Sequence, residues 1–148
     1  MASQKIMALA AVGVTAIILT LATSALLSPS QNSAFDGTVS AANVGVYTNS
    51  ACTTNCTSIS LGDITPGKSK TYTVYVKNTG TVPLTLSMTT SEWNPTSANG
   101  PITLTWDRED YNLNAGASIN AILTLNVSSS ISTSITAFSL NVTIQGTQ

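Results

Sequence analysis

Apolar and polar residues alternate through most of the chain after residue 37, and this period of two is typical of β-strands that bury one face. Short strands separated by turns rich in Gly, Pro and Asn predict two antiparallel sheets packed face to face. We therefore expect an all-β fold, an immunoglobulin-like antiparallel β-sandwich of about seven strands, preceded by an N-terminal hydrophobic helix. The stretches with this pattern are residues 38–47, 57–61, 71–77, 84–88, 102–106, 118–127 and 138–144.

The first of these stretches is irregular. Its inward positions are Val39, Ala41, Val44 and Val46, so the alternation skips one residue between Ala41 and Val44. Because the side chains of a strand repeat every second residue, an extra residue between two inward positions indicates a β-bulge. We expect this bulge near residues 42–43, within one continuous strand.

Residues 6–27 form an uncharged, mostly apolar segment that follows Lys5. A segment of this length can cross a bilayer and directs the chain to a membrane. Two interpretations are open: a signal peptide cleaved near Ala25, or a retained helix that anchors the domain or packs in a filament core. In both, Lys5 stays on the cytoplasmic side and the chain from Ser28 onward is exported.

These features divide the chain into three parts. Residues 1–27 are the signal peptide or hydrophobic helix, residues 28–37 are a linker, and residues 38–148 are the sandwich domain. The exported part keeps roughly 110 residues, which is enough for a single core. We expect an extracellular location at the cell surface, with membrane contact through residues 6–27 before or instead of cleavage.

The composition argues against several classes of function. The chain has no His, and its five Lys and Arg nearly balance its six Asp and Glu, so it has no basic patch that could neutralise nucleic-acid phosphates. Ser and Thr together number 44, which favours strands and turns. Without His, acyl transfer lacks its usual general base. We expect no enzyme, no catalytic, cofactor-binding or metal-binding residues, no small-molecule substrate and no nucleic-acid partner.

Cys52 and Cys56 lie in the loop between the first two predicted strands. Two thiolates without His cannot complete a four-ligand zinc site, and an exported protein meets an oxidising compartment. We therefore expect a local Cys52–Cys56 disulfide that stiffens the loop. A redox role is the alternative, although the spacing differs from that of a C-x-x-C motif.

The run WDREDY gathers the charged residues 107–110 between Trp106 and Tyr111. We expect a solvated turn with local ion pairs. A cation site and a catalytic carboxylate pair are the alternatives, although the two carboxylates of a glycosidase lie on opposite sides of a cleft and not side by side in a turn. Trp106 could also form a sugar-binding platform with Trp93, but it falls on the inward phase of its strand.

Three N-x-[ST] sequons occur, at Asn55, Asn126 and Asn141. Asn55 lies in a loop, and the other two asparagines fall on the outward phase of their strands. We therefore expect all three side chains to reach solvent and to be candidate glycosylation sites.

Three phrases of the exported part carry a family resemblance: the strand start FDGT at residues 35–38, the turn PGKS at 66–69, and the run VKNTGTVPL at 76–84. Together with the targeting segment, they make the chain resemble secreted archaeal β-sandwich filament subunits of threads and bundling pili and, more distantly, TasA- and camelysin-type fibre subunits. In such filaments a strand from the N-terminal end of one subunit completes the sandwich of the next. The resemblance therefore implies a donor strand within residues 33–47 that inserts Val39, Ala41, Val44 and Val46 into a neighbouring copy.

These observations favour a structural subunit of an extracellular filament, with other copies of the same chain as its partners. A scarcity of charge supports this interpretation, because charged residues normally guard sheet edges against pairing. Two alternatives remain: a type IV pilin-like subunit with a retained N-terminal helix, and a membrane-anchored or secreted immunoglobulin-like binding or envelope module.

Overall fold

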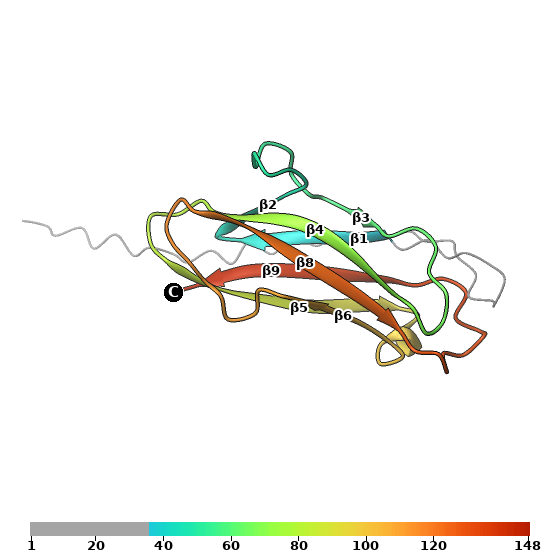
Figure 1. The fold of residues 1–148 in the computed structure, drawn as a ribbon. Coiled ribbons are helices and arrows are strands. Elements are labelled where there is room, and N and C mark those ends of the chain that lie inside the picture. Colours follow the sequence, from blue (N-terminus) through green and yellow to red (C-terminus); the bar gives the residue numbers. More distant parts are fainter. Residues whose placement is uncertain (1–35) are drawn as a thin grey trace, which may run out of the picture.

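The structure is a computed structural model that describes residues 36–148, with side chains from Asn43 onward. The described chain is all-β and forms two sheets packed face to face, with β4 and β8 running obliquely across β9 and β5 of the other sheet (Figure 1). Its one helical turn is the 3₁₀ segment η1, Thr96–Ala98, and no helix in this part of the chain is long and apolar enough to span a membrane. The hydrophobic helix expected within residues 1–27 lies outside the described residues.

Consecutive strands alternate strictly between the two sheets. The odd-numbered strands form a five-stranded sheet in the order β3-β1-β9-β5-β7, and the even-numbered strands form a four-stranded sheet in the order β2-β4-β8-β6. Each connection therefore crosses from one sheet to the other. The bounds are β1 Asp36–Ala42, β2 Val44–Tyr47, β3 Ile59–Ser60, β4 Ser69–Asn78, β5 Leu84–Asn94, β6 Ile102–Trp106, β7 Asn112–Leu113, β8 Ser118–Val127 and β9 Ser139–Thr147.

This order confirms the predicted β-sandwich and corrects the expected immunoglobulin-like arrangement. In an immunoglobulin domain the last two strands lie in the same sheet. Here β8 lies between β4 and β6 in one sheet, whereas β9 lies between β1 and β5 in the other. The error has a physical reason: alternation within a strand shows which face is buried, but it does not show which sheet the strand joins.

The predicted strand positions agree well with the structure at the C-terminal end. β6 and β8 have the predicted bounds, and β4 and β5 extend beyond theirs. β9 begins one residue later and ends three residues later than predicted, and β3 is shorter than the predicted stretch 57–61. The two-residue strand β7 was not predicted, since two residues are too few to show a period. The predicted first strand is two strands, β1 and β2, and β1 begins at Asp36, inside the expected linker.

The core lies between the sheets and contains the inward residues that alternation predicts. The inward-facing residues of β9 are 1% exposed or less, and so are the inward-facing residues at the centres of β4 and β8. The predicted inward residues at the margins are only partly buried and pack against this core: Tyr72, Met88, Leu104, Trp106 and Ile119. The fully enclosed part of the core therefore lies under the central strands.

Gly146, near the end of β9, is a point of close approach between the sheets. A Cβ atom at this position would lie 2.8 Å from Leu84 Cδ1 and 3.1 Å from Val44 Cγ1. Leu84 belongs to β5 of the same sheet and Val44 to β2 of the other sheet, and both side chains are buried. These buried neighbours therefore have little room to move away from a side chain larger than that of Gly.

We expect Gly146→Ala to lower the free energy of unfolding by about 1–3 kcal/mol, because the added methyl overpacks the contact between β9, β5 and β2. Urea unfolding followed by tryptophan fluorescence measures the change. Thr89→Ala, at an exposed position of β5, is the matched control and is expected to change stability by about 0.5 kcal/mol or less. Equal midpoints for the Gly146 variant and the native chain would contradict the close approach.

Candidate functional site: the N-terminal strand and its hinge

β1 occupies an interior position in the five-stranded sheet. It pairs in parallel with β9 along its full length, from Asp36 opposite Ser139 to Ala42 opposite Gln145. On its other side it pairs with the short strand β3 through Asp36 and Gly37 alone. The first described strand of the chain therefore lies between two strands that come later in sequence, and β9 supplies most of its backbone partners.

A single residue, Asn43, joins β1 to β2 and carries the chain from one sheet to the other. Its φ of 59° is in the left-handed region, which Asn tolerates better than most residues. Its side-chain Nδ2 lies 3.5 Å from the Gly146 carbonyl oxygen, at the limit of a hydrogen bond. The predicted bulge near residues 42–43 is thus a one-residue connection between two strands in different sheets. This connection, Asn43, is called the hinge.

The structure divides the four residues of the predicted donor strand between β1 and β2. Val44 and Val46 lie in β2, which pairs with β4, and both are buried in the chain's own core at 7% and 6% exposure. Val39 and Ala41 lie in β1, where their Cα atoms are opposite those of Val142 and Ile144. An exchangeable N-terminal strand would therefore end before Asn43.

The position that β1 occupies between β9 and β3 is called its seat. Without β1, the side of β9 that faces this seat would be an open strand edge. β9 keeps β5 as its antiparallel neighbour on the far side, whereas β3 pairs with no strand except β1 within residues 36–148. Removing β1 would leave the backbone groups of β9 that now face it without partners. An exposed edge of this length is a strong template for another strand.

The loop of residues 48–56 projects from the body beyond β2 (Figure 1). The side chain of Asn49 organises it, because Oδ1 accepts hydrogen bonds from the backbone N–H groups of Thr53 and Thr54 at 3.1 Å and Nδ2 donates to Thr53 Oγ1 at 2.7 Å. The loop returns along the edge of β2, where Cys56 N donates to the Val46 carbonyl at 2.8 Å. The loop therefore covers the outer edge of β2.

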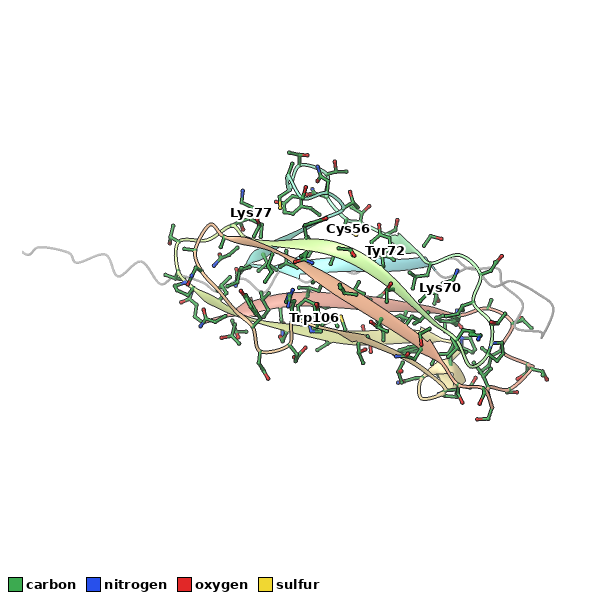
Figure 2. The ribbon with its side chains drawn as sticks, in the orientation of Figure 1. Cys56, Lys70, Tyr72, Lys77 and Trp106 are labelled. Carbon is green, nitrogen blue, oxygen red and sulfur yellow. The ribbon has the colours of Figure 1, made fainter. Side chains whose placement is uncertain are left out.

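Cys52 and Cys56 are free thiols in the structure, so the predicted disulfide is not formed there. Cys52 is partly exposed and has a φ of 52°, whereas Cys56 is 4% exposed and lies close to Tyr72 in the upper half of Figure 2. Burial raises the pKa of the Cys56 thiol to about 11 from an ordinary 9.0. The unfolded chain would lose this proton first as the pH rises, so the free energy of unfolding falls between about pH 9 and 11.

The predicted turn at residues 107–110 connects the two sheets through hydrogen bonds. Glu109 Oε2 accepts hydrogen bonds from Trp106 Nε1 of β6 at 2.6 Å and from the backbone N–H of Met88 in β5 at 3.2 Å. Asp107 Oδ1 accepts from the Ile122 backbone N–H at 2.8 Å, and Asp107 Oδ2 lies 3.6 Å from Arg108 Nη2. Within residues 36–148 no group of three or more His, Cys, Asp or Glu could hold a metal ion. The carboxylates of Asp107 and Glu109 therefore bind backbone and indole N–H groups.

The two tryptophans do not form the considered platform. Trp93 is 8% exposed, and its Nε1 donates to Thr90 Oγ1 at 3.4 Å. Trp106 lies in β6 of the other sheet, in the lower half of Figure 2. A shallow cavity of about 370 Å³ lies elsewhere, on the outer face of β4 and β8, and is lined by Ser50, Tyr75, Ser118, Ile119 and Asn120. Its lining includes neither a carboxylate nor a cationic side chain.

The three sequons have different environments. Asn55 is exposed, and Asn126 is partly exposed with its Oδ1 2.6 Å from Ser69 Oγ. Asn141 is only 6% exposed, and its Nδ2 donates to Glu92 Oε2 at 2.6 Å, so the expectation that it reaches solvent is wrong. Asn126 and Asn141 both lie on strands with a neighbour on each side, and Asn141 differs in that Glu92 of the adjacent strand β5 holds its side chain. Asn55 and Asn126 are therefore the two sequon asparagines with solvent access.

Comparison with known proteins assigns no family: no family model matches the chain, and no curated protein matches it. The candidate site within residues 36–148 is the arrangement of β1, its single-residue hinge and its seat beside β9. The hinge escaped prediction from sequence, although the skipped alternation and an Asn that tolerates positive φ marked its position.

We expect a neutral maleimide to label Cys52 quickly in the folded chain and Cys56 only after unfolding, because the Cys56 thiol is buried and protonated. Mass spectrometry of timed samples measures both rates, with Cys52→Ser and Cys56→Ser variants assigning the sites. Equal labelling rates in the folded chain would contradict the buried position of Cys56. Failure of both residues to react without reductant, with reaction restored by reductant, would show that they form the disulfide predicted from sequence.

Proposed function

We propose that this chain is a structural subunit of an extracellular cell-surface filament in which β1 of one copy occupies the seat beside β9 of the next. The observation that carries the proposal is the place of β1, an N-terminal strand that lies inside a sheet and is joined to the rest by one residue. Strand addition of this kind uses main-chain hydrogen bonds that are the same within one chain or between two.

The hinge makes such an exchange simple in mechanical terms. Within residues 36–148, β1 has one covalent connection to the sandwich, at Asn43, so rotation there would move it without displacing β2 from the core. Because β1 makes the same contacts in either seat, the two arrangements differ mainly in the hinge conformation and in the cost of association. Exchange of an identical element between copies is a low-cost route to assembly.

The geometry of exchange favours a filament over a closed dimer when each donor strand reaches forward to a new copy. The contact is then head-to-tail, with a donor on one surface and a seat on another, and such contacts form open filaments unless the rotation closes a ring. The chain carries only 11 charged residues with a net charge of −1, so repulsion between copies is weak. The partners of the chain are therefore further copies of itself.

The other parts of the chain fit this function. The apolar segment at residues 6–27 would deliver the domain through the membrane, as a cleaved signal peptide or as a retained helix, and would place it at the cell surface. Glycans at Asn55 and Asn126 would suit an exported subunit, because both asparagines have solvent access. A structural role needs no catalytic residue or cofactor.

A membrane-anchored or secreted binding or envelope module is the second candidate. It is favoured by the pairing of β1 with β9 of its own chain, which completes the sandwich without a neighbour. A type IV pilin-like subunit with a retained helix is a third arrangement of the same parts, in which residues 6–27 form the filament core. In the strand-exchange filament β1 leaves its own sandwich, and in the pilin-like filament the N-terminal helices assemble. The anchored or secreted module does neither.

The pair Ser40→Cys and Thr143→Cys tests the exchange in the full chain with Cys52 and Cys56 replaced by Ser. The two Cα positions are direct partners in the β1–β9 ladder, so their spacing suits a disulfide. In assembled material we expect oxidation to link successive copies, which gives a ladder of covalent oligomers on non-reducing denaturing gels.

Ser40→Cys with Thr73→Cys is the control, because Thr73 is exposed on β4 of the other sheet and is expected to give no ladder. In assembled material, a monomer whose two introduced cysteines are bonded to each other would contradict strand exchange. Filaments that contain only this internal bond would favour the helix-core arrangement, and the same monomer without filaments would favour the anchored or secreted module.

A further inference from the structure

The four outer edges of the two sheets differ in how they are protected. β3 and β7 are two residues long, and the chain returning at residues 54–56 hydrogen-bonds along the edge of β2. β6 has five residues, ITLTW, without a charged side chain. Edges that are neither very short nor protected by charged side chains are the ones that pair with further strands. β6 is therefore the least protected edge in the part of the chain that the structure describes.

The hydrogen-bond ladder shows which backbone groups of β6 point outward. Ser128 N donates to the Pro101 carbonyl at 2.8 Å, and bonded pairs alternate with non-bonded pairs in an antiparallel ladder. Leu104 and Trp106 are therefore in non-bonded pairs with β8, and their N–H and C=O groups point away from it. No backbone partner for these groups is seen within residues 36–148.

The surroundings limit how a strand can add to this edge. Ile102 is already paired with Asn99 in an isolated parallel bridge, so the start of β6 is less open to an added strand. Asp107, Arg108, Glu109 and Asp110 follow β6 directly and carry a net negative charge. A parallel copy would place two such clusters side by side, whereas an antiparallel copy separates them to opposite ends of the pair.

We propose that β6 pairs with β6 of a second copy, antiparallel and about a twofold axis at Thr105. In this register Leu104 lies opposite the partner copy's Trp106, and each of these pairs exchanges two main-chain hydrogen bonds. The outward N–H and C=O groups of Leu104 and Trp106 in the two copies then hydrogen-bond to one another. The two four-stranded sheets join into one continuous sheet across the axis.

The side chains suit the same register. Leu104 and Trp106 are only partly buried in one copy, and pairing covers their exposed apolar surface on the inner face. Thr105 is exposed on the outer face and meets its own copy, a Thr–Thr pair that is favourable between neighbouring strands. A register centred on Leu104 would instead pair Ile102 with the partner copy's Trp106, at the end of β6 that the bridge to Asn99 already covers.

This contact is isologous, uses the sheet opposite to β1 and does not depend on strand exchange. In a filament the β6–β6 contact would link two neighbouring rows of subunits side by side. In an unassembled chain it would give a dimer.

Thr105→Cys tests the contact in the full chain with Cys52 and Cys56 replaced by Ser. Directly opposite residues in a non-bonded antiparallel pair have Cα atoms about 4.5 Å apart, which suits a disulfide. We expect a covalent dimer on oxidation and no higher oligomer, since each chain carries one thiol. Thr73→Cys, exposed on an interior strand, is the control and is expected to stay mostly monomeric.

Thr105→Lys should weaken the dimer about tenfold or more, because two like charges would meet at the axis. Thr71→Lys, at an exposed position of β4, should not. Light scattering measures the native mass of both variants, and circular dichroism checks their fold. Equal dimerisation of the two lysine variants, or equal cross-linking of the two cysteine variants, would overturn the proposal.

Mixing the Thr105→Cys chain with a Ser40→Cys chain, both without Cys52 and Cys56, distinguishes this contact from strand exchange. We expect the Thr105→Cys chain to cross-link with itself and not with the Ser40→Cys chain. A mixed dimer of the two variants as the main product would overturn the proposal, because it would place β1 of another copy at the β6 edge.

Discussion

The parallel pairing of β1 with β9 gives β9 a hydrogen-bonding neighbour on each side, and the rest of the sandwich depends on that position. The buried side chains of β9 form the middle of the core, with Leu140, Val142 and Ile144 at 1% exposure or less. If β1 were absent, the most buried strand of its sheet would become an edge. The stability of the whole domain is thus tied to a strand held by one hinge residue, and the seat beside β9 must be filled either by the chain itself or by a neighbour.

The strict alternation of strands between sheets distributes the connections over both ends of the sandwich, and polar side chains hold these connections in place. Asn78 is fully buried and donates to the Val82 and Leu113 carbonyls at 2.7 and 3.1 Å, while its Oδ1 accepts from Gly80 N at 2.9 Å. Glu109 joins β6 to β5 in the same way at another crossing. A buried amide with its partners satisfied specifies one loop conformation, because any other would leave polar groups unpaired.

The sequence predicts the local features of this fold better than its connectivity. Alternation located β6 and β8 and assigned Val74, Ala121 and Leu125 to the core, because one buried face imposes a period of two. It could not separate β1 from β2, since a left-handed Asn43 and a bulge leave the same skipped position. It also placed Asn141 in solvent from its phase alone, whereas its exposure depends on neighbouring side chains such as Glu92 of β5. Pairing partners far apart in the chain decide both outcomes.

The proposed strand exchange would join subunits at the seat beside β9, and electron cryomicroscopy of surface filaments built from this chain would examine that seat directly. A helical reconstruction at a resolution that separates strands should show density between β3 and β9 that continues through Asn43 into the neighbouring subunit. Density in the seat that continues through Asn43 into β2 of the same sandwich would contradict strand exchange.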